Sequence, residues 1–194
     1  EEVAASAEAV AGGAPPMAEA EADEGGGFGV SIDRAAWLRV AHPGCLPRVR
    51  AVAPGATLPI RLTPESDTTV SLGFGGDVMF GRRFYDAGGD GLSERARIDP
   101  AARARSHREI LRDVRPLLDH VDVASVNLET PLTTTDWRYP GKTFQFTSHP
   151  AAAGALADAG VDYAALGNNH VFDALTPGLD DTREALTRAD VPED

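Results

Sequence analysis

Apolar and polar positions follow a regular order only from about residue 68 onward. Residues 69–74 alternate polar and apolar side chains and end in a glycine pair, a pattern typical of a strand that runs into a tight loop. Two more short apolar runs and three amphipathic or alanine-rich stretches follow it. The predicted order is strand 69–74, helix 106–118, strand 121–126, helix 150–159, strand 161–166 and helix 176–189.

Local signals mark the ends of the predicted helices. Ser106 and Glu109 form a capping-box pattern, and Pro116 must kink or restart the helix that follows. Gly160 lies just past the second helix, while Thr176 is predicted as an N-cap with proline at the next position. Strands that alternate with helices indicate a layered α/β fold with parallel strand pairs.

The N-terminal third lacks this order. Residues 1–29 are rich in Ala, Glu and Gly and have almost no large apolar side chains, so we predict a disordered acidic linker. Residues 30–67 contain apolar side chains that are repeatedly interrupted by proline. Two interpretations of this second segment stay open, a small β-rich appendage or the remnant of an upstream domain. Residues 68–194 are predicted to form the α/β domain.

Composition narrows the classes of partner. The chain has 30 acidic against 18 basic residues and a net charge of −12, which argues against broad contact with nucleic acid or an anionic membrane surface. The excess of acidic residues is compatible either with cation binding or with an acidic surface that is simply solvated. No run approaches the roughly 18 apolar residues of a membrane span. The single cysteine leaves the redox compartment undetermined.

Each predicted strand ends in a polar cluster. Asp77 follows the first strand, Glu129 the second, and Asn169 and His170 the third. Ligands of α/β sheets bind at the carboxyl ends of strands, so these side chains are expected to converge. Carboxylate and amide oxygens suit a divalent metal, which activates water, and a neighbouring histidine can stabilise developing charge.

Each of these residues also has a structural explanation when it is taken alone. Asp77 could be an ordinary turn residue, and Glu129 could be a surface charge. Asn127 is predicted to position its loop and not to touch a metal. Asp173 could either hold His170 or form a turn, and both alternatives stay open. Two further arginines, Arg82 and Arg83, could meet an anionic substrate or remain solvated.

Four stretches in the expected order resemble the CapA family, also called poly-γ-glutamate capsule-synthesis proteins. Gly-Asp-Val-Met-Phe-Gly-Arg at 76–82 resembles the opening metal motif, and the stretch 122–132 with its Asn-Leu-Glu-Thr-Pro-Leu ending resembles the second. The passage 144–162 resembles the central strand-to-helix region, and Gly-Asn-Asn-His-Val-Phe-Asp at 167–173 the third motif. The resemblance covers roughly residues 68–194.

That family is similar to calcineurin-like metallophosphoesterases, in which β-sheets are flanked by helices. The resemblance implies that Asp77 is a first metal ligand, Glu129 takes the place of the bridging carboxylate, and Asn169 is an amide ligand. His170 would be the neighbouring acid or charge stabiliser. The implied cofactors are divalent ions of the Mn, Zn or Fe class. The family's later histidine motifs are expected beyond residue 194, so the chain is expected to hold the N-terminal half of the domain, truncated at its C-terminus.

Two functions follow as expectations. The first is metal-dependent hydrolysis, or a related transfer, at a phosphate, amide or ester bond of a cell-envelope polymer or its precursor. The resemblance implies a role in capsule or poly-γ-glutamate synthesis and a cell-envelope or extracytoplasmic location, with this chain inactive by itself. The second is a non-catalytic accessory protein that binds a polyanionic polymer or an assembly partner.

Overall fold

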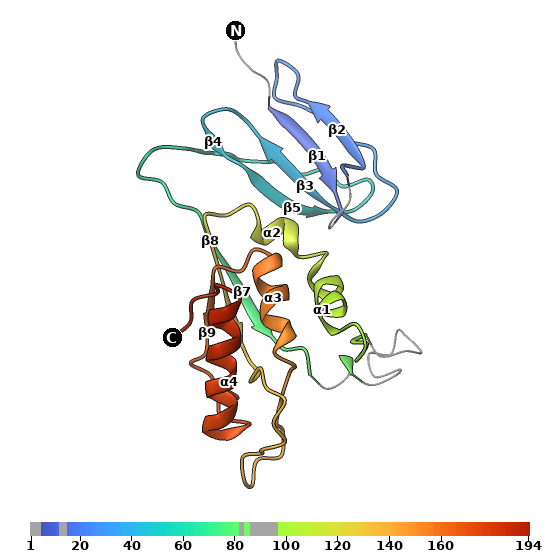
Figure 1. Cartoon of the computed structure of the whole chain (residues 1–194). Coiled ribbons are helices and arrows are strands. Elements are labelled where there is room, and N and C mark those ends of the chain that lie inside the picture. The colour runs from blue at the N-terminus through green and yellow to red at the C-terminus, as the bar shows by residue number, and fades with distance from the viewer. Residues whose placement is uncertain (1–4, 12–14, 82–83, 86–96) are drawn as a thin grey trace. The chain divides into compact units, whose positions relative to one another are not determined.

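The structure of the chain is a computed structural model that describes residues 5–11, 15–81, 84–85 and 97–194 (Figure 1). It divides into two compact units. The N-terminal unit comprises Glu1–Ser71 and Asp113–Asp122, and the C-terminal unit comprises Leu72–Arg112 and Val123–Asp194. Within the part of the chain described, no helix is long and apolar enough to cross a bilayer.

The N-terminal unit is built around an antiparallel sheet with the strand order β2-β1-β3-β5. A separate two-stranded pairing joins β4 and β6, and one short helix, α2, also belongs to this unit. The elements are β1 (Ser6–Val10), β2 (Ala18–Glu21), β3 (Ala36–Ala41), β4 (Cys45–Leu46), β5 (Arg48–Val52), β6 (Thr63–Pro64) and α2 (Arg115–Leu118).

The prediction of a disordered linker over residues 1–29 is wrong for the described part of that segment. Strand β1 pairs with both β2 and β3, and its alternate residues Ala7 and Ala9 are fully buried. Small side chains suffice at these positions because the partner β3 contributes Leu38 and Val40 to the same core. Residues 30–67 are β-rich, but they share one sheet with the preceding segment and do not form a separate appendage.

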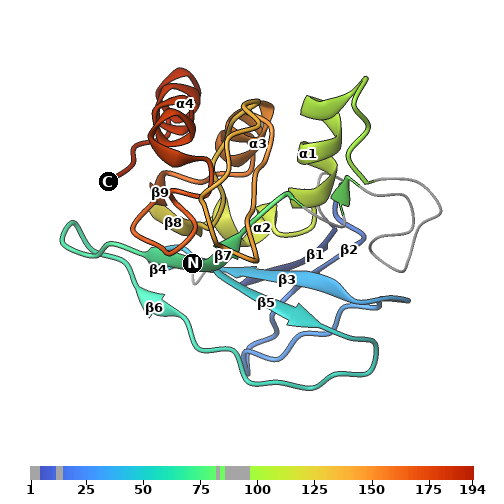
Figure 2. The same cartoon turned by 90° about the horizontal axis from the view of Figure 1, so that it is seen from below.

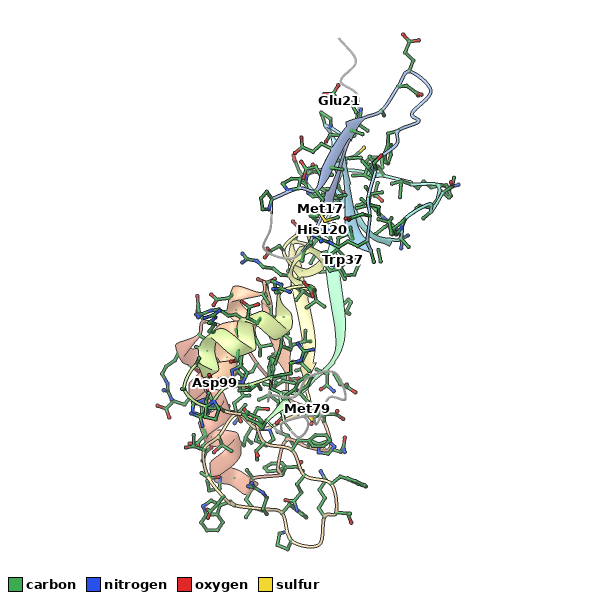
Figure 3. The ribbon with its side chains drawn as sticks, turned by 90° about the vertical axis from the view of Figure 1, so that its right-hand side faces the viewer. Met17, Glu21, Trp37, Met79, Asp99 and His120 are labelled. Atoms are coloured by element: carbon green, nitrogen blue, oxygen red, sulfur yellow. The ribbon has the colours of Figure 1, made fainter. Side chains whose placement is uncertain are left out.

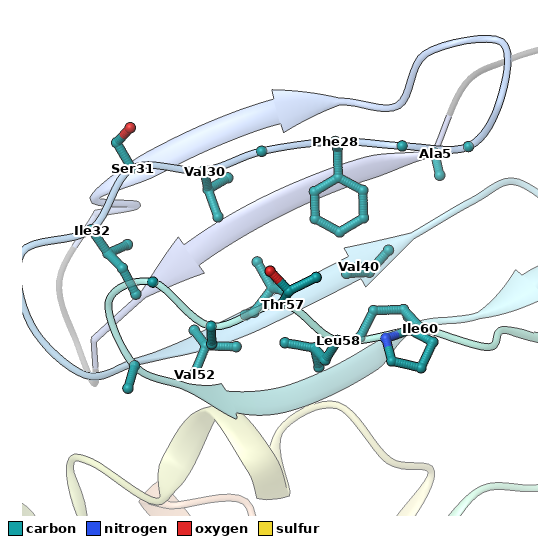
Figure 4. A pocket seen from close by; sticks show the side chains of 18 of the residues that line it. Ala5, Phe28, Val30, Ser31, Ile32, Val40, Val52, Thr57, Leu58 and Ile60 are labelled. Atoms are coloured by element: carbon teal, nitrogen blue, oxygen red, sulfur yellow. The ribbon is translucent and has the colours of Figure 1, made fainter.

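A cavity of about 790 Å³ lies over this sheet (Figure 4). Apolar side chains of two extended segments line it, including Phe28, Val30 and Ile32 before β3 and Leu58 and Ile60 after β5. These side chains alternate with exposed neighbours, as expected for extended backbone with one buried face. No charged side chain lies among the described residues of the lining.

Two polar contacts hold residues 113–122 in the N-terminal unit. The Trp37 indole N–H donates to the carbonyl of Asp113. The His120 ring lies 3.1 Å from the Pro47 carbonyl through Nε2. Trp37 and His120 are both labelled in Figure 3. Residues 113–122 therefore belong to the N-terminal unit, although the chain before and after them belongs to the C-terminal unit. Neither the length nor the composition of this segment indicated that placement.

The C-terminal unit confirms the predicted α/β order. Strands β7 (Leu72–Val78), β8 (Val123–Leu128) and β9 (Tyr163–Ala165) form a parallel sheet in the order β7-β8-β9. Helices α1 (Arg103–Leu111), α3 (Ala151–Asp158) and α4 (Leu175–Arg188) lie on the same side of this sheet in Figure 2, with α3 between the other two.

One face of the sheet supplies the core of this unit. Ala124, Val126 and Leu128 alternate along β8 and are buried, together with leucines of α3 and α4. Strand β7 has a single partner among the described strands, and its Leu72 and Phe74 side chains are 57% and 80% exposed. The sheet thus has an apolar, uncovered surface at β7, as expected of an edge strand without a further layer.

The glycine pair after residue 74 lies inside a strand. Strand β7 continues to Val78, and its pairing with β8 shifts between Phe74 and Asp77. A Cβ atom at Gly75 would stand 2.9 Å from Cγ1 of Val126, so only glycine fits this close approach. The predicted tight loop is therefore wrong, and the glycines instead allow an irregular strand to pass close to β8.

Two predicted helix starts are also wrong. Helix α1 begins at Arg103, and the Ser106 hydroxyl accepts a hydrogen bond from the Asp99 N–H instead of capping the helix. Helix α4 begins at Leu175, so Thr176 lies within its first turn and is not its N-cap. The break expected at Pro116 is present, because α2 is separate from α1.

Histidine burial predicts a loss of stability in mild acid. Burial lowers the pKa of His107, although its hydrogen bond to the Arg103 carbonyl raises it, and burial also lowers the pKa values of His120 and His149. Unfolded histidines bind protons near their ordinary value of 6.5, while these folded ones resist protonation to lower pH. Their contribution to stability is therefore present above pH 6.5 and lost as the pH falls.

We expect the melting temperature to fall between about pH 7.5 and about pH 5.5. The variant His107→Gln, which keeps a donor for the Arg103 carbonyl, is expected to show a shallower fall than the wild type. Thermal melts followed by circular dichroism across this range provide the measurement. A melting temperature that stays constant or rises towards about pH 5.5 would contradict the prediction.

Candidate functional site

The predicted site residues lie where the three parallel strands end. Asp77 of β7 pairs in register with Asn127 of β8, and the two strands run in the same direction. The Glu129 N–H donates to the Val78 carbonyl at 3.0 Å, which continues the pairing past the end of β8. Parallel strands present their carboxyl ends at one edge of a sheet, so both carboxylates lie at the same edge.

Amide side chains connect the three strand ends. Asn127 Nδ2 donates to Asp77 Oδ1 at 2.7 Å, and its Oδ1 accepts from Asn168 Nδ2 at 3.0 Å. Asn168 also donates to the Leu128 carbonyl and accepts from the His170 N–H at 2.9 Å. This series of hydrogen bonds agrees with the prediction that Asn127 positions its loop. It also brings the end of β9 beside the ends of β7 and β8.

His170 is oriented by a buried carboxylate. Its Nδ1 lies 2.7 Å from Oδ2 of Asp173, whose side chain is fully buried. An ionised carboxylate accepts, so we assign the ring proton to Nδ1, which leaves Nε2 without a proton in the neutral ring. Nε2 lies 4.0 Å from Oε1 of Glu129. Of the two alternatives for Asp173, the structure supports the one in which it holds His170.

Lys142 and Phe146 complete what we call the His170 network. Lys142 Nζ donates to Asp173 Oδ1 at 2.5 Å and to the Asn169 carbonyl at 2.6 Å. The Phe146 N–H donates to Asp173 Oδ2, and the Phe146 ring stacks on His170 with centroids 4.0 Å apart. Burial raises the pKa of Asp173, but hydrogen bonds from Lys142, His170 and the Phe146 N–H lower it, and the net shift is downward.

The structure therefore brings Asp77, Glu129 and His170 to one edge. Asn169 directly precedes His170 and is exposed, and its carbonyl accepts a hydrogen bond from Lys142. Arg82 and Arg83 lie outside the described residues. Lys142 is the site residue that the sequence did not reveal, because the Pro-Gly-Lys sequence around it matches no phosphate-binding pattern.

The predicted ligands are of chemical types that bind metal ions. Carboxylate oxygens of Asp77 and Glu129 and the amide oxygen of Asn169 suit hard or borderline divalent ions. Among the residues that the structure describes, however, no group of three or more His, Cys, Asp or Glu side chains is arranged to hold an ion. Asp77, Glu129 and Asn169 therefore offer oxygen donors, but the described residues contain no ready-made cluster of metal-binding side chains.

Comparison with known proteins agrees with the motifs at this edge. No curated protein matches the chain. The family model described as "Bacterial capsule synthesis protein PGA_cap" matches residues 71–193, which include every strand and helix of the C-terminal unit. The match covers more than half of the chain and confirms the resemblance to capsule-synthesis proteins. The chain therefore belongs to the bacterial capsule synthesis protein family PGA_cap.

Proposed function

We propose that this member of a capsule-synthesis family carries part of a metal-dependent hydrolytic site for an envelope polymer or its precursor. The observation that carries the proposal is the His170–Asp173 pair, in which His170 Nε2 lies 4.0 Å from Glu129 Oε1 at the sheet edge that also holds Asp77. A buried, ion-paired carboxylate behind a histidine is typical of sites in which the imidazole handles a proton.

Asp77 and Glu129 would hold the ion, and Asn169 would add an amide oxygen. When bound, such an ion polarises a phosphoryl or carbonyl oxygen and makes a water nucleophilic near neutral pH. The chain's own contribution to binding is the geometry of these ligands. Asn127 holds the Asp77 carboxylate by one oxygen and leaves the other without a hydrogen bond among the described residues.

His170 would act on the substrate itself. Because Asp173 accepts a hydrogen bond from Nδ1–H and stays ionised, the protonated ring could give its Nε2 proton to a leaving oxygen while the carboxylate stabilises the positive charge of the ring. Lys142 keeps Asp173 ionised, and the stacked Phe146 ring prevents His170 from rotating away. The proposed location is the cell envelope, where the polymer is assembled.

The alternative is an accessory protein that binds a polyanionic polymer or an assembly partner without chemistry. This second function requires neither a bound ion nor turnover. Both functions are compatible with the family, and they differ in whether the sheet edge binds an ion and turns over a substrate.

The test is metal-dependent turnover by the full-length protein. We expect calorimetric titration to detect binding of Mn²⁺ or Zn²⁺, and hydrolysis of a model phosphodiester that stops on chelation and returns with the metal. The variant His170→Gln is expected to keep the metal and lose about 10²- to 10⁴-fold in turnover, the usual contribution of a general acid. A folded protein that binds neither ion would exclude the hydrolase and favour the accessory function.

A further inference from the structure

A second polar pocket, of about 540 Å³, lies within the C-terminal unit and outside the His170 network. Residues 145–149 separate the two sites. Phe146 stacks on His170, whereas its neighbours Gln145 and Thr147 line this pocket. Ser148 and His149 line it as well, so one segment contributes to both sites. No acidic side chain lies among the described residues of the lining.

Arg103 gives this pocket its charge. Its Nη1 donates to the Pro100 carbonyl at 2.8 Å, but its Nε is shielded from water and has no acceptor among the described residues. Arg103 also forms no ion pair with a described carboxylate. Burial raises the pKa of Tyr85 and lowers that of His149; the positive charge of Arg103 acts on both groups in the lowering direction, so its charge reaches the pocket. A partly buried guanidinium that has no carboxylate partner among the described residues favours binding of an anionic ligand.

Three neighbouring side chains also offer donors. The Tyr85 hydroxyl accepts from the His149 N–H at 3.0 Å, and its own O–H has no acceptor among the described residues. His149 Nδ1 accepts from the Ala151 N–H at 3.1 Å, so we assign the ring proton to Nε2. The Thr135 hydroxyl is buried without a partner among the described residues. Among the residues that the structure describes, the pocket therefore combines donors that have no acceptor with a lining free of acidic side chains.

We propose that this pocket binds an oxyanion, the phosphate or carboxylate group of a ligand. A guanidinium presents parallel N–H groups that match two oxygens of such a group, and hydroxyl and imidazole donors suit its remaining lone pairs. The donors lie at residue 85 after β7, on α1, and on the segments before and after residues 136–144, so the tertiary structure assembles the site. The inference does not depend on the proposed metal or on turnover at His170.

Binding of inorganic phosphate and of succinate to the chain tests the proposal. We expect saturable binding in calorimetric titrations with chloride matching the ionic strength, and the tighter of the two ligands identifies the group. Arg103→Met is expected to weaken binding at least about tenfold. Arg105→Met, which removes an exposed charge from the same helix, is the matched control and is expected to bind like the wild type.

A second variant separates loss of binding from loss of folding. Thr135→Val keeps the side-chain shape and removes a hydroxyl that is unpartnered in the ligand-free protein, so it is expected to melt no lower than the wild type while binding phosphate more weakly. The His170→Gln variant is expected to bind normally, which distinguishes this site from the proposed catalytic one. Absence of saturable binding in the wild type, or equal weakening by Arg103→Met and Arg105→Met, would overturn the proposal.

Discussion

Replacing Asp173 with alanine is expected to lower the free energy of unfolding of the C-terminal unit by about 3–5 kcal/mol. The substitution removes the acceptor of three hydrogen bonds, from Lys142 Nζ, the His170 ring and the Phe146 N–H. Lys142 would keep a positive charge that is only 24% exposed and no longer paired with a carboxylate, and the Phe146 N–H would lose its hydrogen bond to Asp173. Unpaired buried groups, and not the lost carboxylate itself, make the effect large.

Urea denaturation of the variant and the wild type measures this difference. Asp180→Ala, at an exposed position of α4, is the control and is expected to change stability by less than about 0.5 kcal/mol. Asp173→Asn keeps an oxygen for the Phe146 N–H and is expected to fall between the two. A change of less than about 1 kcal/mol for Asp173→Ala would show that the network does not hold this part of the fold.

The difference in stability between the wild type and Asp173→Ala is expected to shrink as the pH falls. The net pKa shift of Asp173 is downward from 3.8, so its contribution to stability is complete above that value. It is lost as the pH falls through the lower value of the folded state. The wild type and Asp173→Ala are therefore expected to converge in stability in strong acid. A constant difference down to about pH 2 would contradict the assignment of an ionised Asp173.

Replacing Asp77 with asparagine is expected to remove most metal binding from the full-length protein. The carboxylate is exposed at the strand ends, and Asn127 already occupies one of its oxygens. Loss of a partner outside the direct ligands typically costs 10- to 100-fold in metal affinity, so loss of a direct ligand is expected to cost at least about 100-fold. The amide keeps one oxygen for Asn127, so the melting temperature without metal is expected to stay the same.

Calorimetric titration with Mn²⁺ decides this prediction. Asp180→Asn removes one negative charge from an exposed site on α4 and controls for nonspecific attraction of cations. Glu129→Gln is expected to resemble Asp77→Asn, since both carboxylates are proposed ligands. If Asp77→Asn binds the ion like the wild type while Glu129→Gln does not, the assignment of Asp77 is wrong and the ion is held elsewhere at the edge.

The sequence by itself determined the order of elements in the C-terminal unit and the place of its polar clusters. Both depend on local information, because alternation or helical periodicity is read over a few residues and a strand end is marked by the residues that follow it. Asp77, Glu129 and His170 were therefore predicted from the sequence. Their common edge followed from the general rule for parallel strands, which the structure obeys.

Contacts between distant residues were decided only by the tertiary structure. Strand β1 has little apolar volume of its own, and it is ordered because β3, about 30 residues later, pairs with it. Lys142 bonds to groups 27 and 31 residues away, and Arg103, which precedes β8 in the sequence, shares its pocket with His149, which follows β8. A single sequence carries no local signal for such pairs, because their stabilisation arises from burial and hydrogen bonds that exist only after the chain has folded.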